Sequence, residues 1–127
     1  MRSIIGLLFL GMLFSSNANA IYLRNCSNLG TTFRVCSIFV NINFSVVNRA
    51  LGQEMFLSEC HNTSSKGVSK LYEQCINENF AKIADALENQ VSFRLCNNRK
   101  KHKVSREFIS CIDENFDIVE SELIDKD

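Results

Sequence analysis

Apolar residues recur at intervals of three and four along the second half of the chain, the spacing that places them on one face of an α-helix. The first stripe predicts a helix from about Val68 to Val91, and the second predicts a helix that begins near Ser105 and ends near Ile124. Ser69 and Ser105 lie where N-terminal caps are expected. The members of the two stripes are Val68, Leu71, Tyr72, Cys75, Ile76, Phe80, Ile83, Ala84, Leu87 and Val91, then Val104, Phe108, Cys111, Ile112, Phe116, Val119 and Leu123.

A third stripe lies in the N-terminal half. We expect a helix here too, although further apolar residues broaden the stripe and leave a strand over residues 35–47 as the alternative. The chain contains no proline, which suits long uninterrupted helices. The stripe comprises Leu29, Phe33, Cys36, Val40, Phe44, Val47 and Leu51, and the residues that broaden it are Ile38, Phe39, Ile42 and Val46.

The chain contains an internal repeat. Residues 60–80 align with residues 96–116 without a gap, and nine of the 21 aligned residues are identical. Both copies carry two cysteines at the same spacing, a Val-Ser pair and a closing Glu-Asn-Phe. A weaker third copy is predicted in the N-terminal third, where Cys26 and Cys36 are followed by the run Asn41-Ile42-Asn43-Phe44.

The first twenty residues have the arrangement of a secretory signal peptide. One cation, Arg2, precedes an apolar run over residues 4–14, and a small polar stretch ends at Ala18-Asn19-Ala20. The apolar run is too short to cross about 30 Å of hydrocarbon, so cleavage after Ala20 is predicted. We therefore expect a signal peptide over 1–20 and a single cysteine-rich helical domain over 21–127, secreted and extracellular, with no membrane span.

An even number of cysteines in a short exported chain indicates disulfides. The repeat favours pairing within each unit, which closes loops that each contribute about 3 kcal/mol, although other pairings are open. No two cysteines have the close spacing of zinc ligands, so neither a metal nor another cofactor is expected. The predicted fold class is all-α, a small disulfide-stabilised bundle of about three amphipathic helices. The six cysteines are Cys26, Cys36, Cys60, Cys75, Cys96 and Cys111.

Three Asn-x-Ser sequons also fit an exported glycoprotein. They begin at Asn25, Asn43 and Asn62. Asn25 is weakened because the cysteine that follows it is expected to be bridged, and Asn43 qualifies only if it faces solvent.

The residues that catalysis would need are sparse. His61 is not repeated at the matching position of the second copy, and His102 lies in a basic run, so both are interpreted as solvated loop residues. Glu78 and Glu114 recur, yet they lie away from the apolar stripes, where a carboxylate is normally solvated. We expect no enzymatic activity. The repeated asparagines beside the stripes are expected to hydrogen bond between helices: Asn79 and Asn115.

Fourteen Lys and Arg balance fourteen Asp and Glu, which gives no reason to expect a nucleic-acid partner. Cations nevertheless gather between residues 94 and 106, and the following helix is acidic. This pattern predicts a patch for a sulfated glycan, an anionic lipid headgroup or an acidic protein, with a solvated loop as the alternative. The same run offers a dibasic cleavage site at 99–101. The patch residues are Arg94, Arg99, Lys100, Lys101, Lys103 and Arg106.

Two functional hypotheses follow. The first is a secreted helical protein that binds an extracellular macromolecule, as an effector, signal or structural component. The second is a carrier of a small apolar ligand held in the helical core. The carrier hypothesis predicts a cavity lined by residues such as Phe33, Phe80, Phe108 and Phe116.

Overall fold

The computed structural model describes residues 22–26, 32–52 and 57–125. This part of the chain forms three helices, α2 (Phe33–Leu51), α3 (Lys70–Ala86) and α4 (Arg106–Asp125), and no strand. The predicted all-α bundle is thus confirmed, and the strand alternative over 35–47 is wrong. The predicted signal peptide at 1–20 lies outside the described residues.

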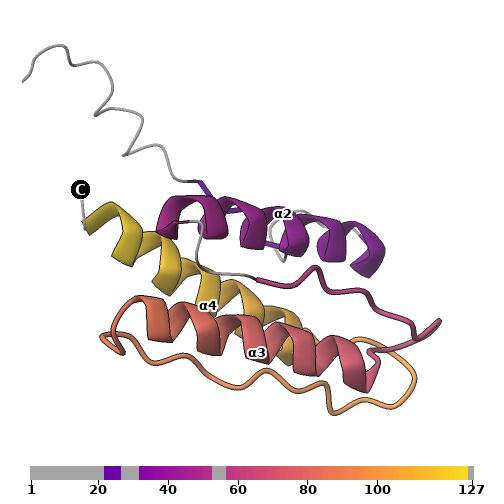
Figure 1. Ribbon diagram of the computed structural model, residues 1–127. Coiled ribbons are helices and arrows are strands. Elements are labelled where there is room, and N and C mark those ends of the chain that lie inside the picture. Colours follow the sequence, from indigo (N-terminus) through magenta and orange to yellow (C-terminus); the bar gives the residue numbers. More distant parts are fainter. Residues whose placement is uncertain (1–21, 27–31, 53–56, 126–127) are drawn as a thin grey trace, which may run out of the picture.

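All three helices run in the same direction (Figure 1). The segments that lead into α3 and α4 return along the bundle, from the end where the previous helix stops to the end where the next one starts (Figure 1). Each unit consists of an extended segment followed by a helix, so each extended segment brings the chain back to the end at which the next helix starts. The N-termini of all three helices therefore lie at one end of the molecule.

The ends of α4 agree with the sequence prediction, but α3 is shorter than predicted. It starts at Lys70 because the Ser69 side chain accepts a hydrogen bond from the Tyr72 backbone N–H and caps the helix. It ends at Ala86. Glu88 and Asn89 then adopt φ angles of 58° and 57°, which lie in the left-handed region and are incompatible with a right-handed α-helix.

Each unit contains one disulfide. Cys26 is bonded to Cys36, Cys60 to Cys75, and Cys96 to Cys111, which is the pairing within units that the repeat favoured. The Cα atoms are 5.6 Å apart in the second and third units and 5.1 Å apart in the first. Each bond fastens an extended segment to the helix that follows it.

The core is layered by the repeat. Phe44, Phe80 and Phe116 stand 36 residues apart in sequence, and their ring centroids lie 4.9–5.3 Å from one another. Burial of each ring contributes about 2 kcal/mol. The layers on either side are equally regular and fully buried: Val40, Ile76 and Ile112 on one side, and Val47, Ile83 and Val119 on the other.

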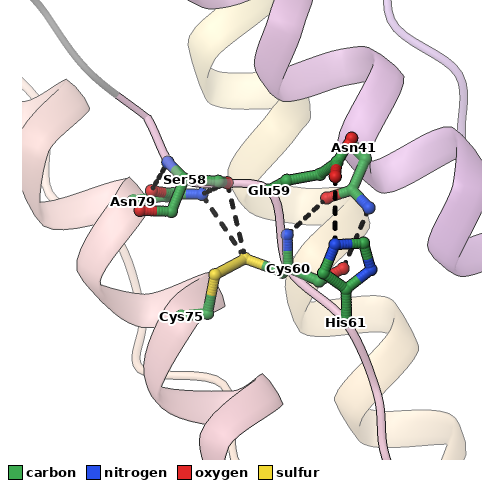
Figure 2. A network of polar contacts seen from close by, with 7 residues as sticks. All are labelled: Asn41, Ser58, Glu59, Cys60, His61, Cys75 and Asn79. Atoms are coloured by element: carbon green, nitrogen blue, oxygen red, sulfur yellow. Dashed lines mark hydrogen bonds and ion pairs between the residues drawn. A yellow bond between two sulfur atoms is a disulfide. The ribbon is translucent and has the colours of Figure 1, made fainter.

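Buried asparagines fasten each extended segment to the helix of its own unit. The Asn79 side chain accepts a hydrogen bond from the Ser58 backbone N–H and donates one to the Ser58 carbonyl (Figure 2). Asn115 makes the same pair of bonds with Arg94. The prediction that these asparagines bond between helices is wrong, because both bond to backbone.

The same contact identifies the N-terminal unit as a third copy of the repeat. Asn43, which precedes Asn79 by 36 residues, accepts a hydrogen bond from the Arg24 N–H and donates one to the Arg24 carbonyl. All three asparagines are at most 1% exposed. The weaker repeat seen in the sequence is therefore a structural one.

A second set of side chains links each helix to the next unit. Asn41 of α2 bonds to both backbone groups of Cys60 (Figure 2), and Asn77 of α3 does the same to Cys96. At the equivalent position of α4, Asp113 accepts a hydrogen bond from the Cys26 N–H at 2.8 Å. The three units thus form a closed ring, first to second to third and back to the first.

Candidate functional site

Two loops at the N-terminal end of the bundle share one backbone framework. We call residues 62–69 and 98–105 the two cap loops. In the first, Asn62 accepts a hydrogen bond from the Ser69 N–H and donates to the carbonyls of Ser64 and Gly67. In the second, the matching asparagine accepts from the Ser105 N–H and donates to the carbonyls of Lys100 and Lys103. Each loop is held by its asparagine and its capping serine, and the residues between them differ between the two loops.

Those intervening residues differ sharply in charge. The first cap loop reads Thr-Ser-Ser-Lys-Gly over 63–67, and the second reads Arg-Lys-Lys-His-Lys over 99–103. All five side chains of the second loop are exposed. Because the first loop keeps the same framework with a single cation, the basic residues of the second loop are not needed to fold it.

The two cap loops touch. A Cβ added to Gly67 would lie 3.2 Å from the Lys101 carbonyl oxygen and 3.3 Å from the Lys103 nitrogen, so only glycine fits this approach without displacing the neighbouring backbone. One surface hollow is bordered by Arg34, Lys66 and Val104, which belong to three different units. A second hollow, which Val104 also lines, is bordered by Lys100, Lys103 and Arg106.

These contacts join cations from all three units into one surface, which we call the basic seam. Among the described residues, Glu107 of α4 is the one acidic residue bordering either hollow. Arg99, the first cation of the second cap loop, is exposed but borders neither hollow. The basic seam consists of Arg34, Lys66, Lys100, Lys101, Lys103 and Arg106.

The helix dipoles reinforce this positive end. The N-terminus of an α-helix carries a partial positive charge, so a cation in the first turn is unfavourable by about 0.3–1 kcal/mol. Each helix nevertheless has one there: Arg34 in α2, Lys70 in α3 and Arg106 in α4. The first turns of α3 and α4 also carry an acid, Glu73 and Glu107, and the Glu73 carboxylate lies 4.0 Å from the Lys70 ammonium. Among the three helices, Arg49 of α2 is the one basic residue in a last turn. The first-turn cations are therefore not placed where the helix dipoles favour them.

Arg94 does not belong to this surface, although the sequence grouped it with the other patch residues. Its backbone is held by Asn115, nine residues beyond Arg106 and thus about 13 Å further along α4. Its guanidinium forms a 2.8 Å salt bridge with Glu114. The sequence prediction also missed Arg34 and Lys66, because both lie far from residues 94–106 in the sequence. Only the folded repeat brings them to the same end of the bundle as the second cap loop.

The three sequons occupy different environments. Asn43 is buried with both amide atoms hydrogen-bonded, so the condition that it face solvent is not met. Asn62 is half-buried, and its amide nitrogen donates to two carbonyls of its own cap loop. Asn25 is also half-buried, and its side chain hydrogen bonds to Asp117.

The residues considered for catalysis are dispersed. His61 is exposed and pairs with the exposed Glu59 at 3.0 Å (Figure 2), and His102 is exposed in the second cap loop. Glu78 is exposed on α3, and Glu114 is engaged by Arg94. Among the described residues, no group of three His, Cys, Asp or Glu side chains could hold a metal ion.

The dibasic segment 99–101 lies inside the loop closed by Cys96 and Cys111. Cleavage there would leave the third unit attached through this disulfide. It would, however, open the second cap loop and separate the cations of the basic seam.

A hollow beside α2 with two exposed isoleucines was also missed by the sequence interpretation. Ile38 and Ile42 are 53% and 44% exposed and border a hollow with Glu59 and His61. The matching positions of α3 are Gln74 and Glu78, so the isoleucines are peculiar to the first unit. The signal in the sequence was the apolar broadening of this stripe.

No described helix is both long enough and apolar enough to cross a bilayer. Comparison with known proteins identified no matching family, no curated relative and no solved structure of similar fold.

Proposed function

We propose that this chain is a secreted binding protein that engages an anionic extracellular macromolecule through the basic seam. The observation that carries the proposal is the contrast between the two cap loops. They share hydrogen bonds, caps and position, yet one carries a single cation and the other carries four together with a histidine. Since the fold does not require these charges, a ligand of opposite charge is the physical reason to keep them together.

Export supports the same proposal. The predicted signal peptide directs the chain to an oxidising compartment, and three disulfides suit that environment. The cations concentrate at one end although the chain as a whole is neutral. An exposed, one-signed surface raises the local concentration of an oppositely charged partner and speeds its association.

The core offers less support for an apolar carrier. The phenylalanines expected to line a cavity pack against other rings instead: Phe33 lies 6.3 Å from Phe108, and Phe80 lies 4.9 Å from Phe116, centroid to centroid. The last three of these residues are at most 2% exposed. We therefore favour binding at the surface over binding in the core.

Transplanting one cap loop onto the other tests the proposal. Residues 99–103 are replaced by Thr-Ser-Ser-Lys-Gly, the sequence of 63–67, which removes three positive charges and keeps the loop framework. The control removes three charges elsewhere by Arg24→Gln, Arg49→Gln and Arg94→Gln. Binding of both proteins to a set of immobilised polyanions is then measured against salt concentration.

We expect the wild-type chain and the control to bind at least one polyanion, and the transplant to bind it about tenfold more weakly. Circular dichroism and thermal unfolding verify that the transplant is folded. Equal loss in the control and the transplant would show that only net charge matters, and failure of the wild-type chain to bind any polyanion would reject the function.

A further inference from the structure

We infer that the anionic partner is a sulfated polysaccharide whose chain lies across the contact between the two cap loops and is held by cations of all three units. This inference rests on the proposed function and narrows it. It names the class of ligand. It also adds Arg34 and Lys66, which lie outside the basic run of the sequence, to the binding site.

The cations of the basic seam border two adjoining hollows. They do not surround one deep pocket that would hold a single phosphate or sulfate. Arg34 and Lys66 border one hollow, Lys100 and Arg106 border the next, and Lys103 lies beside Val104, which both hollows share. A row of separated cations fits a ligand whose negative charges also recur along a chain.

The surface between the cations is polar. The hollow beside Arg34 is also bordered by Ser37, Ser64 and Ser65, and by Asn62, whose amide is already engaged in its own cap loop. The serine hydroxyls can donate to the hydroxyl and ring oxygens of a sugar and accept from its hydroxyl groups. A polysaccharide thus finds partners for its uncharged groups as well as for its sulfates.

The surroundings of the cations favour a sulfated chain over a membrane. Stable docking on anionic lipid adds exposed apolar side chains, which enter the bilayer interface, to the attraction of the cations. The large exposed apolar residues of the described chain, such as Ile38, Ile42 and Leu71, border neither hollow of the basic seam. The apolar residues that do border them, Phe33, Val104 and Ile109, are half-buried and packed against the core.

An acidic protein fits less well for a related reason. Protein interfaces draw most of their affinity from a few apolar or aromatic anchors that are fully desolvated on binding. The hollows of the basic seam present lysine, arginine and serine to solvent, and no exposed aromatic side chain among the described residues borders them. Binding by cations and hydroxyl groups, without apolar anchors, suits a densely sulfated chain.

The test compares four probes with the mature, oxidised chain. They are a heparin oligosaccharide, the same oligosaccharide with its sulfates removed and its carboxylates retained, poly-glutamate, and vesicles containing phosphatidylserine. The variants are Arg34→Ala and Lys66→Ala, and the matched controls, which remove one cation away from the basic seam, are Arg49→Ala and Arg94→Ala. Affinities are measured by titration at two salt concentrations.

We expect the sulfated oligosaccharide to bind at least about tenfold more tightly than the other three probes. Each seam variant should weaken this binding about threefold, and each control should leave it unchanged. The effect of Arg34→Ala is the most informative, because Arg34 belongs to a different unit from the basic run.

Other outcomes would overturn the inference in distinguishable ways. If poly-glutamate, vesicles or the desulfated oligosaccharide bind as tightly, the class of ligand is wrong and the proposed function stands. If Arg34→Ala and Lys66→Ala have no effect, the ligand does not cross between the units. If no probe binds, both the ligand class and the proposed function fail.

Discussion

At the scale of single residues, Tyr72 differs from the other large core side chains because it buries a hydroxyl group. Its side chain is fully buried, and its hydroxyl has no hydrogen-bond partner among the described residues, whereas the equivalent residue of the third unit is Phe108. Burial accordingly raises the pKa of the Tyr72 hydroxyl. A buried hydroxyl without a partner lowers stability, because its hydrogen bonds to water are lost and not replaced.

Tyr72→Phe is therefore expected to raise the free energy of unfolding by about 1 kcal/mol. Urea unfolding of the oxidised chain measures the change. Tyr22→Phe serves as the control, because Tyr22 is 74% exposed and its hydroxyl is hydrated in both states. A loss of stability in Tyr72→Phe would contradict this prediction, because it would mean that the Tyr72 hydroxyl does have a hydrogen-bond partner in the folded protein.

Asp117 makes stability depend on pH. Partial burial and the negative charges of Asp113, Glu120 and Glu114 raise its pKa, while a hydrogen bond with Asn25 opposes the rise. The folded protein thus holds the Asp117 proton more tightly than the unfolded chain does. Ionised Asp117 costs stability above its folded pKa, and this cost disappears as the pH falls through that pKa.

Asp117→Asn should consequently raise the melting temperature at pH 7 and change it little at a pH below the ordinary aspartate pKa. Thermal unfolding between about pH 3 and pH 7 gives the comparison. Glu78→Gln, on the exposed face of α3, is the control. An equal rise in melting temperature at both ends of the pH range would show that Asp117→Asn does not act by removing the charge of Asp117.

At the scale of elements, the helix starts provide a comparison within one molecule. Ser69 and Ser105 accept hydrogen bonds from the backbone N–H groups three residues later, at 3.2 and 3.1 Å. Thr32, which precedes α2, makes no such bond with its side chain. Removing a cap of this kind typically costs about 1 kcal/mol.

Ser105→Ala and Ser69→Ala are each expected to lower the free energy of unfolding by about 1 kcal/mol, and Thr32→Ala by a few tenths at most. Chemical denaturation of the three variants tests this order. The Ser69 variant should lose slightly more, because its hydroxyl also accepts from the Thr63 N–H. An equal effect at all three positions would mean that the hydroxyl cap is not the source of the stability.

The periodicity of apolar residues was sufficient to predict the helices, because each one buries a single stripe against the same core. It did not predict where α3 ends, since Leu87 is buried like Ile83 four residues earlier although the helix has already stopped. Nor did it predict the role of the buried asparagines. Asn43 and Asn79 resemble ordinary polar residues in the sequence, and their partners are backbone groups of a segment about 20 residues earlier.

At the scale of the whole molecule, the parallel order of the units determines the electrostatics. The cysteines and the repeat predicted three similar units, but similarity alone does not say whether their helices are parallel. The ring of side-chain contacts from Asn41, Asn77 and Asp113 to the next unit requires it. As a result, the positive ends of three helix dipoles coincide with the cations of the basic seam, which no local pattern could show.

This coincidence predicts how stability responds to salt. The cations of the basic seam repel one another and the helix N-termini, and salt screens that repulsion: the Debye length falls from about 30 Å at 10 mM to about 8 Å at 150 mM. The free energy of unfolding of the wild-type chain should therefore rise over this range of sodium chloride, by up to about 1 kcal/mol.

The cap-loop transplant has three fewer cations at this end, so it should be at least as stable as the wild-type chain at low salt and gain less as salt is added. Unfolding by urea at both concentrations measures the two slopes. Equal slopes would show that the cations of the second cap loop do not destabilise the folded protein by mutual repulsion.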